Sequence, residues 1–176
     1  MIYVTVEERK LVFKGSKISV IVEKISGERG VYEAEIVKHP GAVVILPLKK
    51  DKIIMVEQYR PAVEENLLEL PAGTLEPGED PFSCAARELE EETGYKPGKL
   101  EILGSFYASP GYSNEKLYAF IAEDLILGER KPEIDEDIRV LEIGEDELLR
   151  MIERGEIKDS KTLSTFFLYY MKKMLP

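Results

Sequence analysis

The chain has 176 residues, 44% hydrophobic and 33% charged, a balance that predicts one main domain with an ordinary apolar core. Its 34 acidic and 24 basic residues give a formal net charge of −10, which disfavours binding to the phosphate backbone of a nucleic acid. The single cysteine, Cys84, excludes an intramolecular disulfide. Because no signal peptide is recognisable and no apolar run approaches the roughly 20 residues of a membrane helix, we expect a cytoplasmic protein without a membrane partner.

The first forty residues are predicted to form an amino-terminal extension made of β-strands. β-Branched or alternating apolar residues mark four strand segments: 3–6, 11–13, 18–22 and 31–37. Glycine and serine at 26–30 supply a turn before the last of them. A meander this small buries little surface by itself, so we expect it to pack on the rest of the chain or pair with a second copy. His39-Pro40-Gly41 marks the boundary, which assigns residues 1–40 to the extension and 41–176 to the main domain.

The main domain is predicted to combine a mixed sheet with a few helices. Strands are expected at 42–48, 53–58, 67–70, 101–108 and 117–122, the first two joined as a hairpin. A helix is expected over 80–93, because Asp80 is a candidate N-cap, Pro81 suits the first helical position and Gly94 suits a left-handed stop. Two further helices are expected at 145–153 and 160–173.

Three acidic residues of the first helix, Glu88, Glu91 and Glu92, share one arc, because each residue advances by about 100°. Like charges at this spacing repel and destabilise an isolated helix. A hard divalent cation, Mg²⁺ or Mn²⁺, removes that repulsion and prefers carboxylate ligands. On these three residues alone, a solvated acidic face is the alternative. The rigid loop at 71–79 favours a metal site, because it can bring backbone carbonyls and Glu79 towards the same cations.

The residues that carry this chemistry follow a fixed spacing. Gly73, five residues, Glu79, seven residues, then Arg87-Glu88-Leu89-x-Glu91-Glu92-x-Gly94-Tyr95 match the Nudix box at every defined position. Seven fixed residue types over 23 positions make this a highly specific pattern, and the chain resembles the Nudix hydrolases. The resemblance implies an α/β/α sandwich around a mixed sheet, in which the box forms a loop–helix–loop that binds metal and pyrophosphate.

The resemblance also implies roles for the residues of the box. Glu88 and Glu92 correspond to the principal metal ligands, with Glu91 and the main-chain carbonyl of Ala72 as further ligands. Arg87 is expected to pair with Glu79 or Glu91 and orient it. Gly73 and Gly94 are expected to matter for the shape of the backbone. Two or three cations are implied once substrate is bound.

Three further segments resemble the ADP-ribose pyrophosphatases within this family. Residues 57–60 followed by 67–73 resemble their EQxR…ExPAG stretch, and Pro110 lies fifteen residues past the end of the box, as is typical of that group. Residues 32–41 resemble part of its extra amino-terminal sheet, which in relatives exchanges across a homodimer. The resemblance implies hydrolysis of ADP-ribose to AMP and ribose 5-phosphate with Mg²⁺, by a homodimer joined through that sheet.

Candidate substrate-binding residues are Arg60, Glu35 and Pro110. The planar fork of Arg60 can hold a phosphate or ribose hydroxyls, and a surface ion pair with a neighbouring glutamate is the alternative. Glu35 corresponds to a substrate-contacting acid in some relatives, but the arginine that often precedes it is Ala34 here. This departure leaves the adenine pocket unassigned.

Hydrolysis also needs a carboxylate that takes a proton from the attacking water. In this group the base tends to lie on a loop after the box, and residues 133–140 are the matching loop. Glu136 is the first candidate and Glu133 the second, with Glu91 as a further catalytic residue; a solvated acidic loop is the alternative. Two rival functions remain, namely another Nudix activity (on a nucleotide sugar, NADH, a dinucleoside polyphosphate or a damaged nucleoside triphosphate) and an ADP-ribose sensor without activity.

Overall fold

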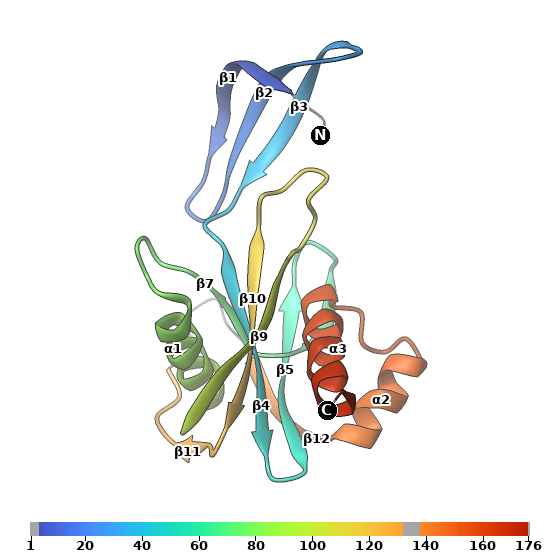
Figure 1. Ribbon diagram of the computed structural model, residues 1–176. Coiled ribbons are helices and arrows are strands. Elements are labelled where there is room, and N and C mark those ends of the chain that lie inside the picture. The colour runs from blue at the N-terminus through green and yellow to red at the C-terminus, as the bar shows by residue number, and fades with distance from the viewer. Residues whose placement is uncertain (1–3, 132–137, 176) are drawn as a thin grey trace. The chain divides into compact units, whose positions relative to one another are not determined.

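The computed structural model describes residues 4–131 and 138–175, and its internal contacts divide the chain into two compact units (Figure 1). The first unit comprises residues up to Gly41 together with 106–116, and the second comprises 42–105 and the residues from Leu117 onwards. No helix in the described part of the chain is long and apolar enough to span a membrane.

The first unit is built on an antiparallel sheet of three strands, β1 (Thr5–Lys14), β2 (Ser19–Gly27) and β3 (Gly30–Lys38), in the order β1-β2-β3. The expected turn at 26–30 is confirmed, since Gly27 pairs with Gly30 across two intervening residues. The separation of 3–6 from 11–13 was wrong, because β1 runs without a break from Thr5 to Lys14, with two register shifts against β2. Charged residues at 7–10 interrupt the apolar alternation without ending the strand.

The second unit contains a mixed sheet of seven strands. Five of them form the path β12-β5-β4-β10-β9, while β6 pairs with β5 and β7 with β4. Strand β4 runs parallel to β10 and meets β5 only near their shared turn. The strand bounds are β4 (Ala42–Lys49), β5 (Lys52–Arg60), β6 (Glu65–Glu69), β7 (Ala72–Thr74), β9 (Lys99–Tyr107), β10 (Lys116–Glu123) and β12 (Ile138–Gly144).

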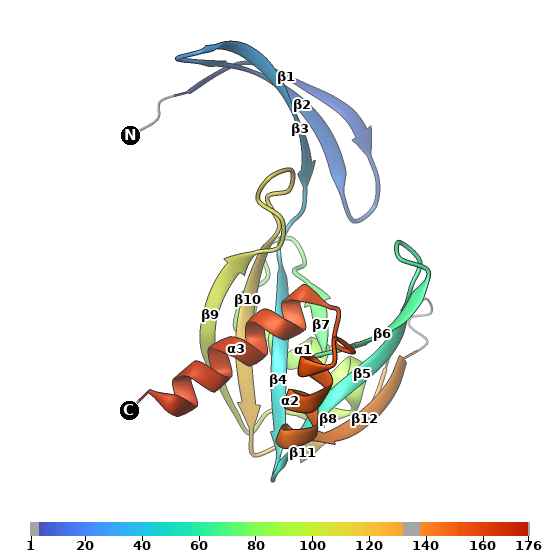
Figure 2. The same ribbon diagram turned by 90° about the vertical axis from the view of Figure 1, so that its right-hand side faces the viewer.

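Helices cover both faces of this sheet (Figures 1 and 2). Helix α1 (Pro81–Thr93) lies on one face, and α2 (Glu145–Glu153) and α3 (Ser160–Met174) lie on the other. Val43 and Ile45 of β4 pack in one apolar cluster with Ala85 and Leu89 of α1. Because β4 is covered on both sides, its apolar run is continuous rather than alternating. The expected α/β/α arrangement around a mixed sheet, with an amino-terminal antiparallel sheet, is therefore confirmed.

Four strands were not expected. Strands β7, β8 (Tyr95–Lys96) and β11 (Ile126–Leu127) have two or three residues, too few to show a period in the sequence. Strand β12 begins at Ile138 and therefore includes Arg139 and Val140, which had been assigned to a loop. It pairs with β5 over seven residues, a long-range contact that the sequence does not show.

Candidate active site on helix α1

Helix α1 begins and ends as the sequence predicts. The Asp80 carboxylate accepts a hydrogen bond from the Ser83 N–H at 3.0 Å, and Pro81 is the first helical residue. Gly94 ends the helix with a left-handed φ of 77°, and its N–H donates to the Glu90 carbonyl at 2.8 Å. These two caps set where the helix begins and ends.

Glu88 and Glu92 lie on the buried side of α1, with only 8% and 2% of their surfaces exposed. The Glu92 carboxylate accepts a hydrogen bond from the Ala72 N–H at 3.1 Å. The Glu88 carboxylate lies against Gly73, where a Cβ atom would stand 1.8 Å from Glu88 Cδ. Gly73 is thus required for the space that Glu88 occupies. A solvated acidic face does not describe these two carboxylates.

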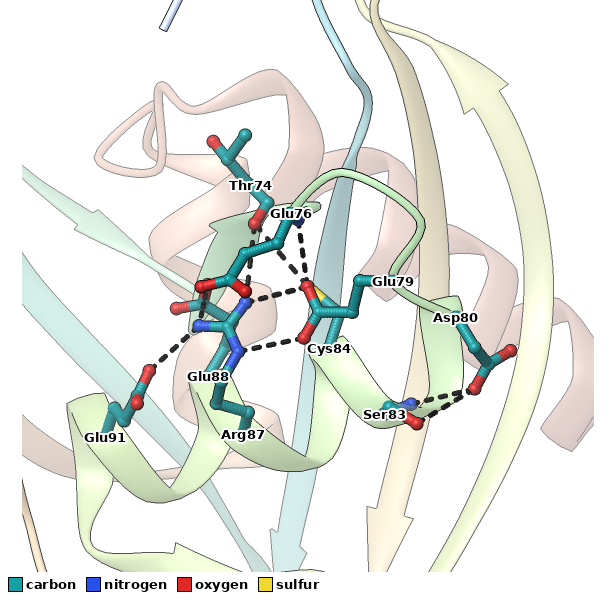
Figure 3. Close-up of polar contacts among 9 residues, drawn as sticks. All are labelled: Thr74, Glu76, Glu79, Asp80, Ser83, Cys84, Arg87, Glu88 and Glu91. Atoms are coloured by element: carbon teal, nitrogen blue, oxygen red, sulfur yellow. Dashed lines mark hydrogen bonds and ion pairs between the residues drawn. The ribbon is translucent and has the colours of Figure 1, made fainter. Parts of the chain in front are cut away.

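Arg87 joins the helix to the loop before it (Figure 3). Its Nε and Nη2 donate to the two carboxylate oxygens of Glu79 at 2.9 and 3.0 Å. Its Nη1 donates to Glu88 at 2.8 Å and to Glu91 at 2.9 Å. Arg87 therefore pairs with both expected carboxylates and with Glu88 as well. Its hydrogen bonds lower the pKa of Glu79 to about 2, which keeps that carboxylate ionised.

The donor set around Arg87 suits a hard divalent cation. Three carboxylates share one guanidinium, which leaves two negative charges unbalanced, and the buried Glu92 lies one helical turn from Glu88. Such oxygen ligands are those that Mg²⁺ and Mn²⁺ prefer. Among residues 4–131 and 138–175, no three acidic, histidine or cysteine side chains converge on a metal position as they stand. A cation here would have to draw oxygens of Glu88 and Glu91 away from Arg87.

A pocket of about 720 Å³ opens beside the exposed edge of this cluster. Arg87 and Glu91 line it from α1, and Lys96, Gly128 and Lys131 line it from the segments that follow the helix. The cluster therefore borders a space that a ligand can enter.

Arg60, the last residue of β5, is paired with a glutamate of the neighbouring strand β6. Its Nε and Nη2 donate to Glu69 at 2.8 and 2.5 Å, and the Glu69 side chain is only 1% exposed. The pKa of Arg60 is raised chiefly by these hydrogen bonds, with smaller contributions from the charges of Glu92 and Asp159. Arg60 thus forms the ion pair with a neighbouring glutamate that was the alternative to substrate binding. Glu69 in this pair is buried, however, and the charge of Glu92 also acts on Arg60.

Glu35 and Pro110 lie together in the first unit, where they line a pocket of about 560 Å³. The segment that carries Pro110 is fastened to β3, because Val37 N–H donates to the Tyr112 carbonyl at 2.8 Å and its carbonyl accepts from Asn114 N–H at 3.2 Å. Other residues lining this pocket include Arg9, Glu23, Ala34, Tyr107 and Tyr112.

Arg9 is a candidate that the sequence did not reveal. It pairs in register with Glu23 of β2, which in turn pairs with Ala34 of β3, so the three residues form one row across the sheet. Arg9 Nε donates to the buried Glu23 carboxylate at 2.7 Å. The strand that carries Arg9 is exposed along its whole length and showed no motif. Only the pairing of strands places an arginine in the same row as Ala34, one strand beyond Glu23.

The two candidate bases, Glu133 and Glu136, lie outside the described residues. Hydrogen bonds link the described residues on either side of positions 132–137 to the end of α1, directly or through Arg130. Lys131 N–H donates to the Glu91 carbonyl at 3.0 Å, and Arg130 Nε donates to the Glu92 carbonyl at 2.8 Å. The same Arg130 side chain also donates to the Ile138 carbonyl, at the start of β12. Arg130 is a second residue that the sequence did not single out, since it stands in no motif.

Comparison with known proteins agrees with this geometry. A family model of the NUDIX domain matches residues 37–166. The chain belongs to the Nudix family. This Nudix protein is 42% identical over 171 residues to the ADP-ribose pyrophosphatase of Bacillus subtilis, a match that covers 95% of this chain and 92% of the relative. The predicted resemblance to Nudix ADP-ribose pyrophosphatases is confirmed.

Other relatives carry different names. The methanol dehydrogenase activator of Bacillus methanolicus is 42% identical over 156 residues, covering 86% of this Nudix protein and 84% of the relative. A GDP-mannose pyrophosphatase of Escherichia coli is 36% identical over 151 residues, covering 80% and 76%. A solved structure of an ADP compounds hydrolase superposes with a TM-score of 0.85 over 98% of this chain and 96% of the other, at 22% identity. At that identity the structural match supports the fold alone.

Proposed function

We propose that this Nudix protein hydrolyses the pyrophosphate linkage of ADP-ribose, giving AMP and ribose 5-phosphate, with Mg²⁺ or Mn²⁺ as an essential cofactor. The observation that carries the proposal is the position of Glu88 and Glu92, which are buried on α1 against the Ala72–Gly73 backbone. Near-complete coverage of an ADP-ribose pyrophosphatase at 42% identity supports the choice of substrate. Divalent-cation dependence is general in the Nudix family.

The residues present fit the proposed cations. Glu88, Glu92 and Glu91 would hold them together with the Ala72 carbonyl, and two or three ions would offset the charges of the carboxylates and of a diphosphate. Bound cations supply Lewis-acid polarisation of the phosphates and lower the pKa of the water nucleophile. Arg87 holds Glu79 in place and, before a cation binds, keeps Glu91 close to Glu88.

The remaining steps belong to groups that bind the substrate or move a proton. The guanidinium of Arg60 donates hydrogen bonds to a phosphate oxygen of the substrate. Glu136, or Glu133 in its place, takes the proton from the attacking water as the bond from phosphorus to the bridging oxygen breaks. Arg130 supports that base by anchoring the residues that flank it to the last turn of α1.

The pocket of the first unit is proposed to bind a nucleoside. Its lining combines aromatic side chains with hydrogen-bonding groups. Tyr107 and Tyr112 line it together with Glu35 and the Arg9–Glu23 pair. Aromatic rings provide stacking surface for a base, and carboxylates accept hydrogen bonds from amino or hydroxyl groups. Arg9 lies in the same cross-strand row as Ala34, with Glu23 between them, and relatives often carry an arginine at the position of Ala34.

A homodimer joined through the amino-terminal sheet is also proposed. Apolar side chains of this sheet are more than half exposed at Leu11, Val12, Phe13, Val31 and Tyr32, as is Val4 just before it. Apolar residues gathered on one exposed sheet are typical of a protein interface. The division into an extension of residues 1–40 and a Nudix domain of 41–176 and the cytoplasmic location remain predictions.

The nearest rival is a different nucleotide sugar, which the 36% identical GDP-mannose pyrophosphatase favours. A panel assay separates the candidates: purified protein with Mg²⁺ is offered ADP-ribose, GDP-mannose, NADH, a diadenosine polyphosphate and oxidised dGTP, and the products are separated by chromatography. The proposal predicts the highest kcat/KM for ADP-ribose, with AMP and ribose 5-phosphate in equal amounts. A higher kcat/KM for another compound contradicts the choice of substrate, and tight ADP-ribose binding without turnover would identify a sensor.

A further inference from the structure

A second charge cluster lies where β5, β6 and the first turn of α3 meet. Its centre is the buried carboxylate of Glu69, which accepts hydrogen bonds from Arg60 on one side and from Lys161 of α3 on the other. Lys161 also donates to Asp159 at 2.9 Å and is only 16% exposed. A buried carboxylate that loses a partner is costly, so both cations are needed to keep Glu69 in this position.

Glu69 occupies one edge of the Arg60 guanidinium and leaves the other open. It binds the Nε and Nη2 atoms, whereas Nη1 takes no part in these two hydrogen bonds. The Arg60 side chain is 36% exposed. A guanidinium carries five N–H donors in a rigid plane, so fixing one edge also fixes the direction of the other. Arg60 is thereby oriented for a second anion before any ligand arrives.

Helix α3 anchors Glu69 and the residue that follows it. The Asp159 carboxylate caps α3 by accepting from the Thr162 N–H at 2.9 Å. The fully buried Thr162 hydroxyl accepts a hydrogen bond from the Leu70 N–H at 2.8 Å. The first turn of α3 therefore holds Glu69 through Lys161 and Leu70 through Thr162.

The anchored segment continues directly into the metal cluster. The Pro71 carbonyl accepts from the Ile45 N–H at 2.9 Å, and the Ala72 N–H donates to Glu92 at 3.1 Å. Residues 69–72 are thus hydrogen-bonded to a neighbouring element at every position. One end of this segment orients Arg60, and the other end contacts the carboxylate of Glu92.

We propose that Lys161 is a positioning residue for diphosphate binding, acting through Glu69 to hold the guanidinium of Arg60 with its Nη1 edge towards the substrate. This inference rests on the proposed function and extends it to a residue outside every motif of the sequence. Lys161 supplies part of the positive charge that Glu69 requires, so that Arg60 is shared between Glu69 and a phosphate. Without Lys161, the buried carboxylate draws the whole guanidinium to itself.

The test compares Lys161→Met, which keeps the length of the side chain and removes its charge, with the unchanged protein. The steady-state kinetics use the nucleoside diphosphate derivative that is cleaved fastest, and calorimetry measures the affinity for inorganic pyrophosphate in the presence of Mg²⁺. We expect KM and the pyrophosphate Kd to rise about tenfold, the effect of weakening one charge-assisted hydrogen bond, while kcat changes less than about twofold. Lys161→Arg should recover most of both affinities.

A double-mutant cycle separates positioning from a general structural role. In an Arg60→Met background, Lys161→Met should raise neither KM nor the pyrophosphate Kd further, because the residue through which it acts is gone. Lys158→Met removes an exposed ion pair with Glu65 at the same end of α3 and should leave both quantities unchanged. If Lys161→Met does not fold, Lys161→Gln takes its place with a smaller rise expected.

Two results would overturn the inference: unchanged KM and pyrophosphate affinity in folded Lys161→Met, or an equal loss of affinity with and without Arg60. These outcomes are distinct from a failure of the proposed function. If the protein prefers another diphosphate, the KM of Lys161→Met is measured with that substrate. The Kd for pyrophosphate is measured without any turnover.

Discussion

Arg87 and Glu69 lie at the centres of two ion-pair clusters in the second unit, and the two clusters are built in opposite ways. Around Arg87, one guanidinium forms ion pairs with the three carboxylates of Glu79, Glu88 and Glu91. Around Glu69, two cations serve one buried carboxylate, and Asp159 balances the remaining charge. The first cluster carries excess negative charge, whereas the second is neutral as a whole.

This difference separates a site that a ligand must complete from one that the protein completes itself. Carboxylates in excess of their cations repel one another, so the Arg87 cluster gains free energy when divalent ions bind. The Glu69 cluster has its charges paired without any ligand and can hold Arg60 in a fixed direction. Metal binding should therefore change the properties of the first cluster and leave those of the second unaltered.

The largest expected effect comes from removing one charge of the first cluster. Glu92→Gln keeps the shape of the side chain and should lower kcat/KM on the order of a thousandfold, because metal stabilisation of the transition state amounts to several kcal/mol. Glu153→Gln, at an exposed position of α2 away from the cluster, should remain within about twofold of the unchanged enzyme. Initial rates at saturating Mg²⁺ measure both variants. A Glu92→Gln enzyme with more than a tenth of normal activity would refute the role of Glu92.

Metal addition should stabilise the fold through the first cluster alone. At a Mg²⁺ concentration about a hundred times its Kd, the stabilisation is about 2.7 kcal/mol, which corresponds to a rise in Tm of roughly 5–10 °C for a chain of this size. Calorimetric scans should show the same rise in Lys161→Met and a much smaller one in Glu88→Gln. A rise that survives in Glu88→Gln would place the bound ion elsewhere.

Gly73→Ala tests the space that Glu88 occupies. A Cβ atom would stand 1.8 Å from Glu88 Cδ, so the carboxylate must leave its position. We expect the Mg²⁺ concentration for half-maximal activity to increase about ten- to a hundredfold, as for other changes that misplace a ligand. Gly144→Ala is the matched control, since a Cβ there meets no atom within 4 Å. Unaltered metal activation in Gly73→Ala would mean that Glu88 is not a ligand in this position.

The smallest effect concerns pH and the Arg87–Glu79 pair in metal-free protein. The pKa of Glu79 is lowered from 4.5 to about 2, so the pair contributes its full stability above about pH 4.5 and loses it as the pH falls towards 2. Urea unfolding of the unchanged protein and of Glu79→Gln should differ by up to about 1 kcal/mol near neutral pH, with the difference shrinking below pH 4.5. A difference that is the same at pH 3 and pH 7 would contradict the ion-pair explanation.

The sequence revealed the first cluster much better than the second. Glu79, Arg87 and Glu88 lie within ten positions of one another, so a motif and the helical period suffice to bring them together. Glu69 and Lys161 are 92 positions apart and belong to different elements. Their contact depends on how α3 docks on the sheet, which no local pattern encodes.

The same reasoning applies to the fold. Strands with an apolar run or alternation, such as β4, and helices with clear caps, such as α1, were predicted close to their observed bounds. The two-residue strands β8 and β11 and the long-range pairing of β12 with β5 were not. The row of Arg9, Glu23 and Ala34 likewise follows from strand register, which a single sequence leaves open.

A crystal structure with Mg²⁺ and a non-hydrolysable ADP-ribose analogue tests the central claim most directly. We predict cations in contact with the carboxylates of Glu88 and Glu92 and with the Ala72 carbonyl, and diphosphate oxygens within hydrogen-bond distance of Arg60. An analogue bound elsewhere, with Glu88 still paired to Arg87 and no cation beside it, would contradict the claim that these carboxylates gather metal against a diphosphate.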